Sequence, residues 1–211
     1  MRQLATAFLA LALVSACASA QVAPPEPYLT AGETIESQLA ADFNGDGNPD
    51  IAYVAVKEGS RTLRVEFRYV GSDFVQTGVQ ELALDPYPLT DAQLTVTDSD
   101  KGAVLVFEEV TGGTTAVAST HRFRWDTQMD RMRLIGLDAT LYSRTFAHDG
   151  REASWNLLTG DLVTLTLKLN AGAGDHAYDS VGETKTRKRS PPISLENSPS
   201  GDDLLSWPGA E

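Results

Sequence analysis

One short stretch of the chain carries side chains that could bind a metal ion. In Asp42-Phe43-Asn44-Gly45-Asp46-Gly47-Asn48-Pro49-Asp50, oxygen-bearing side chains stand at positions one, three, five and nine, and Gly47 stands at position six. Alternate side chains of a tightly curled loop point inward toward a hard cation such as Ca²⁺, and glycine permits the sharp turn. Position seven would offer its backbone carbonyl. The predicted ligands of this calcium loop are Asp42, Asn44, Asp46, Asn48 and Asp50.

The residues after the loop show which kind of calcium loop it resembles. An EF-hand carries a glutamate at position twelve, whereas this chain has Tyr53 there, inside the apolar run Ile51 to Val56. The stretch Leu39 to Val56 instead resembles an FG-GAP or VCBS-type repeat, as in integrin α-chain propellers, where an Asp-x-Asn-x-Asp-Gly-x-x-Asp loop leads straight into an apolar strand. The resemblance implies a structural loop that fixes a turn between strands. The alternative is an ordinary turn made of turn-forming residues.

A propeller is not expected, because that fold needs several blades, each with its own four-stranded sheet. The chain holds one good loop of this kind. The segment Asp98-Ser99-Asp100-Lys101-Gly102, which also precedes an apolar strand, is at best a decayed copy.

A catalytic site finds little support in the sequence. His148-Asp149 could form an acid–base pair with Ser143 or Ser154 as nucleophile, but residues adjacent in sequence rarely form such a dyad. Asp149-Gly150 is better explained as a hairpin turn. We therefore expect a non-enzymatic protein, with a hydrolase of scattered catalytic residues as an alternative.

The N-terminus predicts export from the cytoplasm. After Met1-Arg2-Gln3, the apolar stretch Leu4 to Val14 has the length of a signal-peptide core and is too short to span a bilayer as a helix. Ala18-Ser19-Ala20 fits signal peptidase cleavage after residue 20. Val14-Ser15-Ala16-Cys17 resembles a bacterial lipobox, which implies a lipid-modified Cys17 and membrane anchoring through it. Both alternatives predict a periplasmic or secreted protein.

Composition limits the partners of the mature protein. The formal net charge of the full chain is −12. This charge argues against nucleic acid and anionic membrane surfaces as partners, and it leaves carboxylates available for divalent cations. Cys17 is the only cysteine, so no internal disulfide can form. The expected role is a calcium-stabilised binding module whose partner is a protein or another component of the cell envelope. An inhibitor of an envelope enzyme such as lysozyme is the alternative.

Between the two ends, alternating and apolar runs predict an all-β fold. Nine segments have strand character, and Gly-, Asp- and Ser-rich turns separate them. The natural topology is an antiparallel meander that forms a sandwich or a partly open barrel. The hairpin Thr114 to Leu137 is expected at the heart of the sheet, with His121, Phe123 and Trp125 opposite Arg122 and Arg124.

The predicted organisation is a signal peptide at 1–20, a Pro-rich tether at 21–33, a β-domain at 34–170 and a disordered tail at 171–211. The tail is expected to be disordered because it is rich in Gly, Ser, Pro and Asp and carries a basic run from Lys185 to Arg189.

Overall fold

A computed structural model describes residues 25–70, 75–170 and 177–206. The predicted signal peptide and Cys17 lie outside the described residues. No helix among the described residues is long and apolar enough to cross a membrane.

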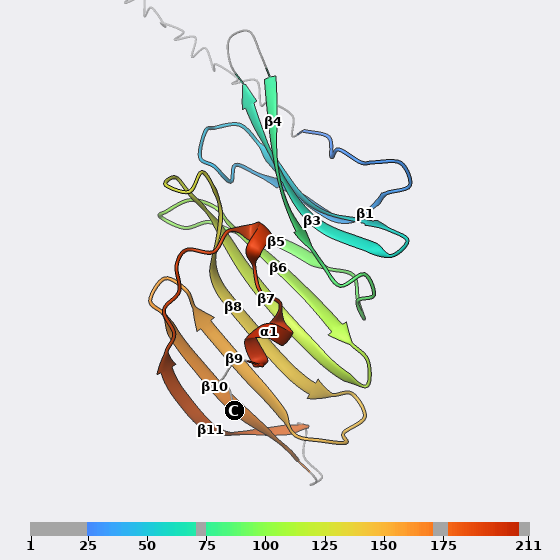
Figure 1. Ribbon diagram of the computed structural model, residues 1–211, viewed down its shortest axis with the longest axis vertical. Helices are drawn as coiled ribbons and strands as arrows, with labels where there is room; N and C mark the ends of the chain where they lie inside the picture. Colours follow the sequence, from blue (N-terminus) through green and yellow to red (C-terminus); the bar gives the residue numbers. More distant parts are fainter. Residues whose placement is uncertain (1–24, 71–74, 171–176, 207–211) are drawn as a thin grey trace, which may run out of the picture.

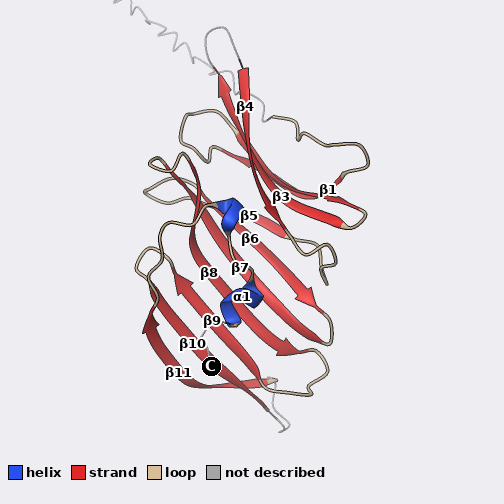
Figure 2. Cartoon of the chain, in the orientation of Figure 1, coloured by secondary structure: helices blue, strands red, loops and turns tan. Residues whose placement is uncertain are grey.

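The described residues form two antiparallel sheets (Figures 1 and 2). The first sheet contains β1 (Thr34–Ala41), β2 (Asp50–Lys57), β3 (Ser60–Val70) and β4 (Val75–Ala83). The second contains β5 (Gln93–Thr97), β6 (Val104–Gly112), β7 (Thr115–Asp126), β8 (Arg131–Ser143), β9 (Gly150–Asn156), β10 (Asp161–Leu169) and β11 (Tyr178–Arg187). Within each sheet, every strand pairs with the next one in sequence, so both sheets are meanders. The predicted all-β antiparallel fold is confirmed, and the sheets stack as open layers.

The hydrophobic core lies between the two sheets and follows the alternation of the strands. Leu63, Val65 and Phe67 of β3 are buried on one side, and Leu105 and Phe107 of β6 meet them from the other. Such alternation is what an antiparallel sheet with one covered face requires. The core is therefore shared by both sheets, which makes them one structural unit.

The outer face of the first sheet is covered by the segment before β1. Arg64 forms an ion pair with Glu33 at 2.8 Å, and Tyr28 donates its backbone N–H to Glu66 at 2.9 Å. The hydroxyl of Tyr53 donates to Glu66 and to the carbonyl of Tyr28. The last residues of the predicted Pro-rich tether thus pack on the domain.

The structure corrects the prediction of a disordered tail over its described part. Residues 178–187 form the edge strand β11, and the chain then crosses the inner face of the second sheet as a 3₁₀ turn, η1 (Leu195–Asn197), and a short helix, α1 (Gly201–Leu205) (Figure 1). Leu195 and Leu204 have no exposed surface. The basic run did not signal this, because β11 leaves its charged side chains in solvent and pairs through its backbone.

A close backbone approach allows this crossing. A side chain on Gly201 would lie 2.8 Å from Cβ of Ser119 and 3.1 Å from Val117, so only glycine fits between α1 and β7. Ser200 and Asp203 form a reciprocal capping box that starts α1 directly above the sheet.

The β7–β8 hairpin confirms the predicted faces. Phe123 is fully buried and Arg124 is partly exposed. We expect Phe123→Ala to lower the free energy of unfolding by about 3–5 kcal/mol, because it leaves a cavity in the shared core. Arg124→Ala should change it by no more than about 0.5 kcal/mol. Chemical denaturation of both variants measures the difference, and equal losses would contradict this register.

The C-terminal segment should contribute to stability through its buried leucines. Leu204→Ala is expected to cost about 2–5 kcal/mol, because it empties a fully buried site under α1. The matched control is Leu158→Ala, since Leu158 is 48% exposed. Urea denaturation compares the free energies of unfolding of the two variants. A negligible change in Leu204→Ala would contradict the docking of the C-terminal segment and support a disordered tail.

Candidate functional site

The predicted calcium loop connects β1 to β2 at one end of the first sheet. Phe43 inserts into the core and is 2% exposed, which anchors the loop at its second position. Gly45 and Gly47 adopt positive φ angles of 77° and 85°, which residues with a Cβ rarely adopt. The sequence prediction that glycine permits the sharp turn is therefore confirmed.

Three of the predicted ligands are linked by hydrogen bonds inside the loop. Asp42 Oδ1 and Asn44 Oδ1 both accept the backbone N–H of Asp46, at 3.1 and 2.9 Å. Asn44 Nδ2 in turn donates to Asp46 Oδ2 at 3.3 Å. Oxygen atoms from positions one and three thus meet at one amide, and the carboxylate at position five contacts the amide at position three; carboxylate and amide oxygens are ligands that a hard cation accepts.

The third carboxylate of the loop, Asp50, lies beneath it. Asp50 is fully buried at the start of β2 and accepts backbone N–H groups from Phe43 at 2.9 Å, Asn44 at 3.4 Å and Arg68 at 3.1 Å. Burial raises its pKa to about 6 despite these hydrogen bonds, and the nearby charge of Asp46 adds to the rise. A cation in the loop would favour the ionised form of this carboxylate.

The same carboxylates also hold the turn by themselves. Asp42 accepts the N–H groups of Gly45 and Gly47 at 2.8 and 2.9 Å, and Asp46 Oδ1 accepts that of Asn48 at 2.7 Å. No group of three or more acidic, histidine or cysteine side chains in the described part of the chain is arranged to hold a metal ion. The residues fit calcium in type and spacing, and binding would require Asp42 and Asp46 to exchange amide contacts for the cation.

His148 and Asp149 do not form the acid–base pair that was considered from the sequence. The ring of His148 contacts the backbone oxygen of Asp149 at 2.6 Å and the hydroxyl of Thr115 at 2.8 Å. The carboxylate of Asp149 instead pairs with Lys168 at 2.5 Å. Ser154 donates to Asp138, away from this turn.

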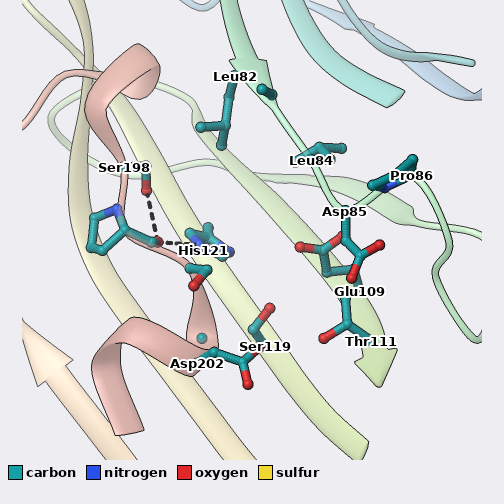
Figure 3. Close-up of a pocket in the computed structure, with 14 residues that line it drawn as sticks. Leu82, Leu84, Asp85, Pro86, Glu109, Thr111, Ser119, His121, Ser198 and Asp202 are labelled. Atoms are coloured by element: carbon teal, nitrogen blue, oxygen red, sulfur yellow. Dashed lines mark hydrogen bonds between the residues drawn. The ribbon is translucent and has the colours of Figure 1, made fainter. Parts of the chain in front are cut away.

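A cavity that sequence reasoning missed lies between the sheets and the C-terminal segment (Figure 3). Its volume is about 370 Å³. It is lined by Leu82–Pro86 at and after the end of β4, by Glu109 and Thr111 of β6, by Ser119 and His121 of β7, and by Ser198–Asp202 before and in α1. The end of β4, the β6–β7 hairpin and the C-terminal segment are far apart in sequence, so only the folded chain brings them together.

His121 forms part of the wall of this cavity. It is 2% exposed, and its ring lies between Phe107, at a centroid distance of 5.6 Å, and Phe123, at 6.0 Å. The predicted position of this histidine on the same strand face as Phe123 is confirmed, and that face lies in the core. Nε2 lies 3.0 Å from the carbonyl oxygen of Pro199, and because a carbonyl only accepts, Nε2 must carry the proton. Nδ1 is then an acceptor, and it has no hydrogen-bond partner.

An ion-pair network lies beside His121. Arg61 of β3 has a side chain 1% exposed and contacts Glu109 of β6 at 2.6 Å and Glu36 of β1 at 2.8 Å. Burial raises the pKa of Glu109, and the carboxylates of Asp85 and Glu36 add to the rise, while Arg61 opposes it. Burial also acts on Glu36, but the hydrogen bonds from Arg61 and from the Ala92 N–H outweigh it and lower its pKa.

The rim of the cavity carries two further carboxylates. Asp85 follows β4 and Asp202 lies in the first turn of α1, and both are exposed. No lysine or arginine is among the described residues that line the cavity. The polar lining therefore consists of carboxylates, hydroxyls and a neutral imidazole.

Comparisons with known proteins place the chain in no group: no protein-family model, curated protein or solved structure matches it.

The buried His121 should make stability depend on pH. Burial lowers its pKa to about 4, against 6.5 for an ordinary histidine, so the unfolded chain binds a proton that the folded chain resists. As the pH falls from about 6.5 to about 4, this histidine should remove about 3 kcal/mol of stability. Denaturation at several pH values should show that the free energy of unfolding falls less steeply with decreasing pH in His121→Phe, which keeps an aromatic ring but cannot titrate.

The matched control replaces the partly exposed His148. His148→Gln should follow the pH dependence of the wild type. If the free energy of unfolding depends on pH in the same way in the wild type and in His121→Phe, protonation of His121 does not destabilise the folded state.

Proposed function

We propose that this protein is an exported, calcium-stabilised β-domain that acts as a non-enzymatic binding module of the cell envelope. The observation that carries the calcium part is the hydrogen-bonded arrangement of Asp42, Asn44 and Asp46 inside a loop whose glycines hold positive φ angles. The resemblance of Leu39 to Val56 to an FG-GAP or VCBS-type repeat supports the same reading. The signal-like N-terminus supports export, with anchoring through Cys17 or release after residue 20.

Calcium would act on stability more than on chemistry. The loop joins the first two strands of the smaller sheet, and Phe43 ties it to the shared core. Three carboxylates at Asp42, Asp46 and Asp50 repel one another unless a cation lies among them. A bound cation would remove this repulsion and the cost of ionising the buried Asp50. The domain would then hold its binding surfaces more firmly in a calcium-rich compartment.

The binding part of the proposal draws on the cavity between the sheets. It is a concave site with apolar and polar walls, which is the form that ligand sites usually take. It opens beside the C-terminal segment, away from the β1–β2 loop. Stabilisation and recognition would therefore belong to two separate parts of the domain.

Thermal melting with calcium and with chelator tests the calcium loop. Without a glutamate at position twelve, the affinity should be modest, with a Kd of roughly 10⁻⁴–10⁻³ M. At ten times Kd, binding to the folded state adds about 1.4 kcal/mol, which should raise Tm by about 3–6 °C. Magnesium should give a smaller gain, because it demands a tighter octahedron and sheds water reluctantly.

Asp46→Asn is the informative variant. It removes one charge yet keeps an oxygen that can accept the Asn48 N–H, so the turn survives while the calcium gain is lost. Asp100→Asn makes the same change in the turn Ser99–Gly102 and should keep the full gain. If the wild type has the same Tm in calcium and in chelator, the loop is an ordinary turn that does not bind calcium.

A further inference from the structure

The cavity wall combines buried acceptors with rim carboxylates. Glu109 and the unpartnered Nδ1 of His121 lie in the buried part, and Asp85 and Asp202 stand at the exposed rim. In Figure 3, His121 lies between the Ser198–Asp202 side and the Asp85–Glu109 side of the cavity. An unpaired buried acceptor is costly, and such groups call for an explanation in a native structure.

The charge of the lining has one sign. Arg61 contributes one positive charge behind the wall, but it is shared between Glu109 and Glu36. Asp85 and Asp202 remain as additional negative groups at the opening. Together with the lone pair of His121, this arrangement gives the cavity a negative potential, which favours a cationic guest.

The remaining lining is apolar or hydroxylic. Leu82, Leu84 and Pro86 form one side of the cavity, and Thr111 and Ser119 contribute hydroxyls from the sheet. An apolar side next to a polar one suits a short alkyl chain that ends in a charged group. The volume of about 370 Å³ is at the lower end of small-molecule sites.

We propose that this cavity binds an alkylammonium group, with Asp85 and Asp202 as its charge partners, His121 Nδ1 as a buried acceptor and Leu82, Leu84 and Pro86 against its alkyl chain. An ammonium has three donors that diverge, which suits acceptors contributed by separate segments. A guanidinium instead prefers two parallel hydrogen bonds to one carboxylate. The buried carboxylate of Glu109 already pairs with Arg61, so an ammonium suits the cavity better. The ammonium could belong to a free amine or to a lysine side chain of a partner protein.

This inference names a ligand for the proposed binding module, and it does not depend on calcium. The binding experiment is therefore run both with calcium and with chelator. Absence of amine binding in both conditions would overturn the inference and would leave the calcium-dependent melting unaffected. Amine binding in both conditions without any calcium-dependent change in Tm would overturn only the calcium loop.

The test is a titration of the ¹⁵N-labelled mature protein with n-butylammonium chloride, followed by amide chemical shifts. Saturable shifts should appear in residues 82–86, 119–121 and 198–202. 1-Butanol, which has the same chain without the charge, should not give them. Equal shifts with butanol, or shifts spread over the whole surface as for a general charge effect, would overturn the proposal.

Variants localise the charge partners. Asp202→Asn and Asp85→Asn should each weaken n-butylammonium binding by about two- to five-fold, as expected for exposed ion pairs. Asp100→Asn, which removes the same charge from a distant turn, should leave the Kd unchanged. Unchanged binding in both cavity variants would overturn the assignment.

His121→Phe separates the buried acceptor from the shape of the site. It keeps an aromatic ring beside Phe107 and Phe123 but removes Nδ1, and it should weaken binding further in the Asp202→Asn background. Unaltered binding would remove His121 from the site. Nα-acetyl-lysine-methylamide as a second probe distinguishes the sources: tighter binding than n-butylammonium assigns the group to a lysine of a partner chain, and weaker binding assigns it to a free amine.

Discussion

The buried guanidinium of Arg61 is the constraint on which the arrangement of the two sheets depends. A charge this deeply buried is tolerated only with partners, and its partners come from different elements: Glu36 of β1, Glu109 of β6 and the carbonyl of Asp85. Glu36 also accepts the Ala92 N–H at 2.5 Å, just before β5. A sliding of one sheet over the other would separate these groups and leave buried charges without partners, which is strongly destabilising.

The same network shapes the cavity. Arg61 holds Glu109 at the inner face of β6, and Ser119 lies opposite Glu109 on β7. The first sheet covers part of this face, and the C-terminal segment covers another part through η1 and α1. The cavity lies where these two covers approach each other. Its polar lining follows from this position, because a junction between two covering elements need not be filled with apolar side chains.

The sequence predicted the features that depend on local pattern. Nine strands and the β7–β8 faces follow from alternation that each segment carries itself, as in Phe123 beside Arg124. β1 and β11 were missed because Thr34–Ala41 mixes polar and apolar residues without alternation, and Tyr178–Arg187 is almost entirely polar. Both are edge strands, which need a neighbour's backbone more than a buried face. The buried leucines of the C-terminal segment stand singly or as a pair, so no period marked them.

The two candidate sites differ in the same way. The β1–β2 loop is contiguous, so its candidate ligands could be predicted from spacing, and its glycine angles agree with that spacing. The cavity is assembled from three regions that are distant in sequence, and none of its residues belongs to a recognisable sequence motif. His121 is the one signal that the sequence offered, as a polar residue on an apolar strand face.

The loop shows why spacing alone does not establish a metal site. The oxygens of Asp42 and Asp46 already accept backbone N–H groups, so the turn is built before any cation arrives. A calcium ion would therefore have to compete with amide donors that already occupy these oxygens. What it could add is relief for Asp50, whose ionised form is disfavoured by burial and by Asp46. The advantage of a cation at this loop would thus be electrostatic: it would stabilise charges that the fold brings together, in a turn whose shape the backbone already maintains.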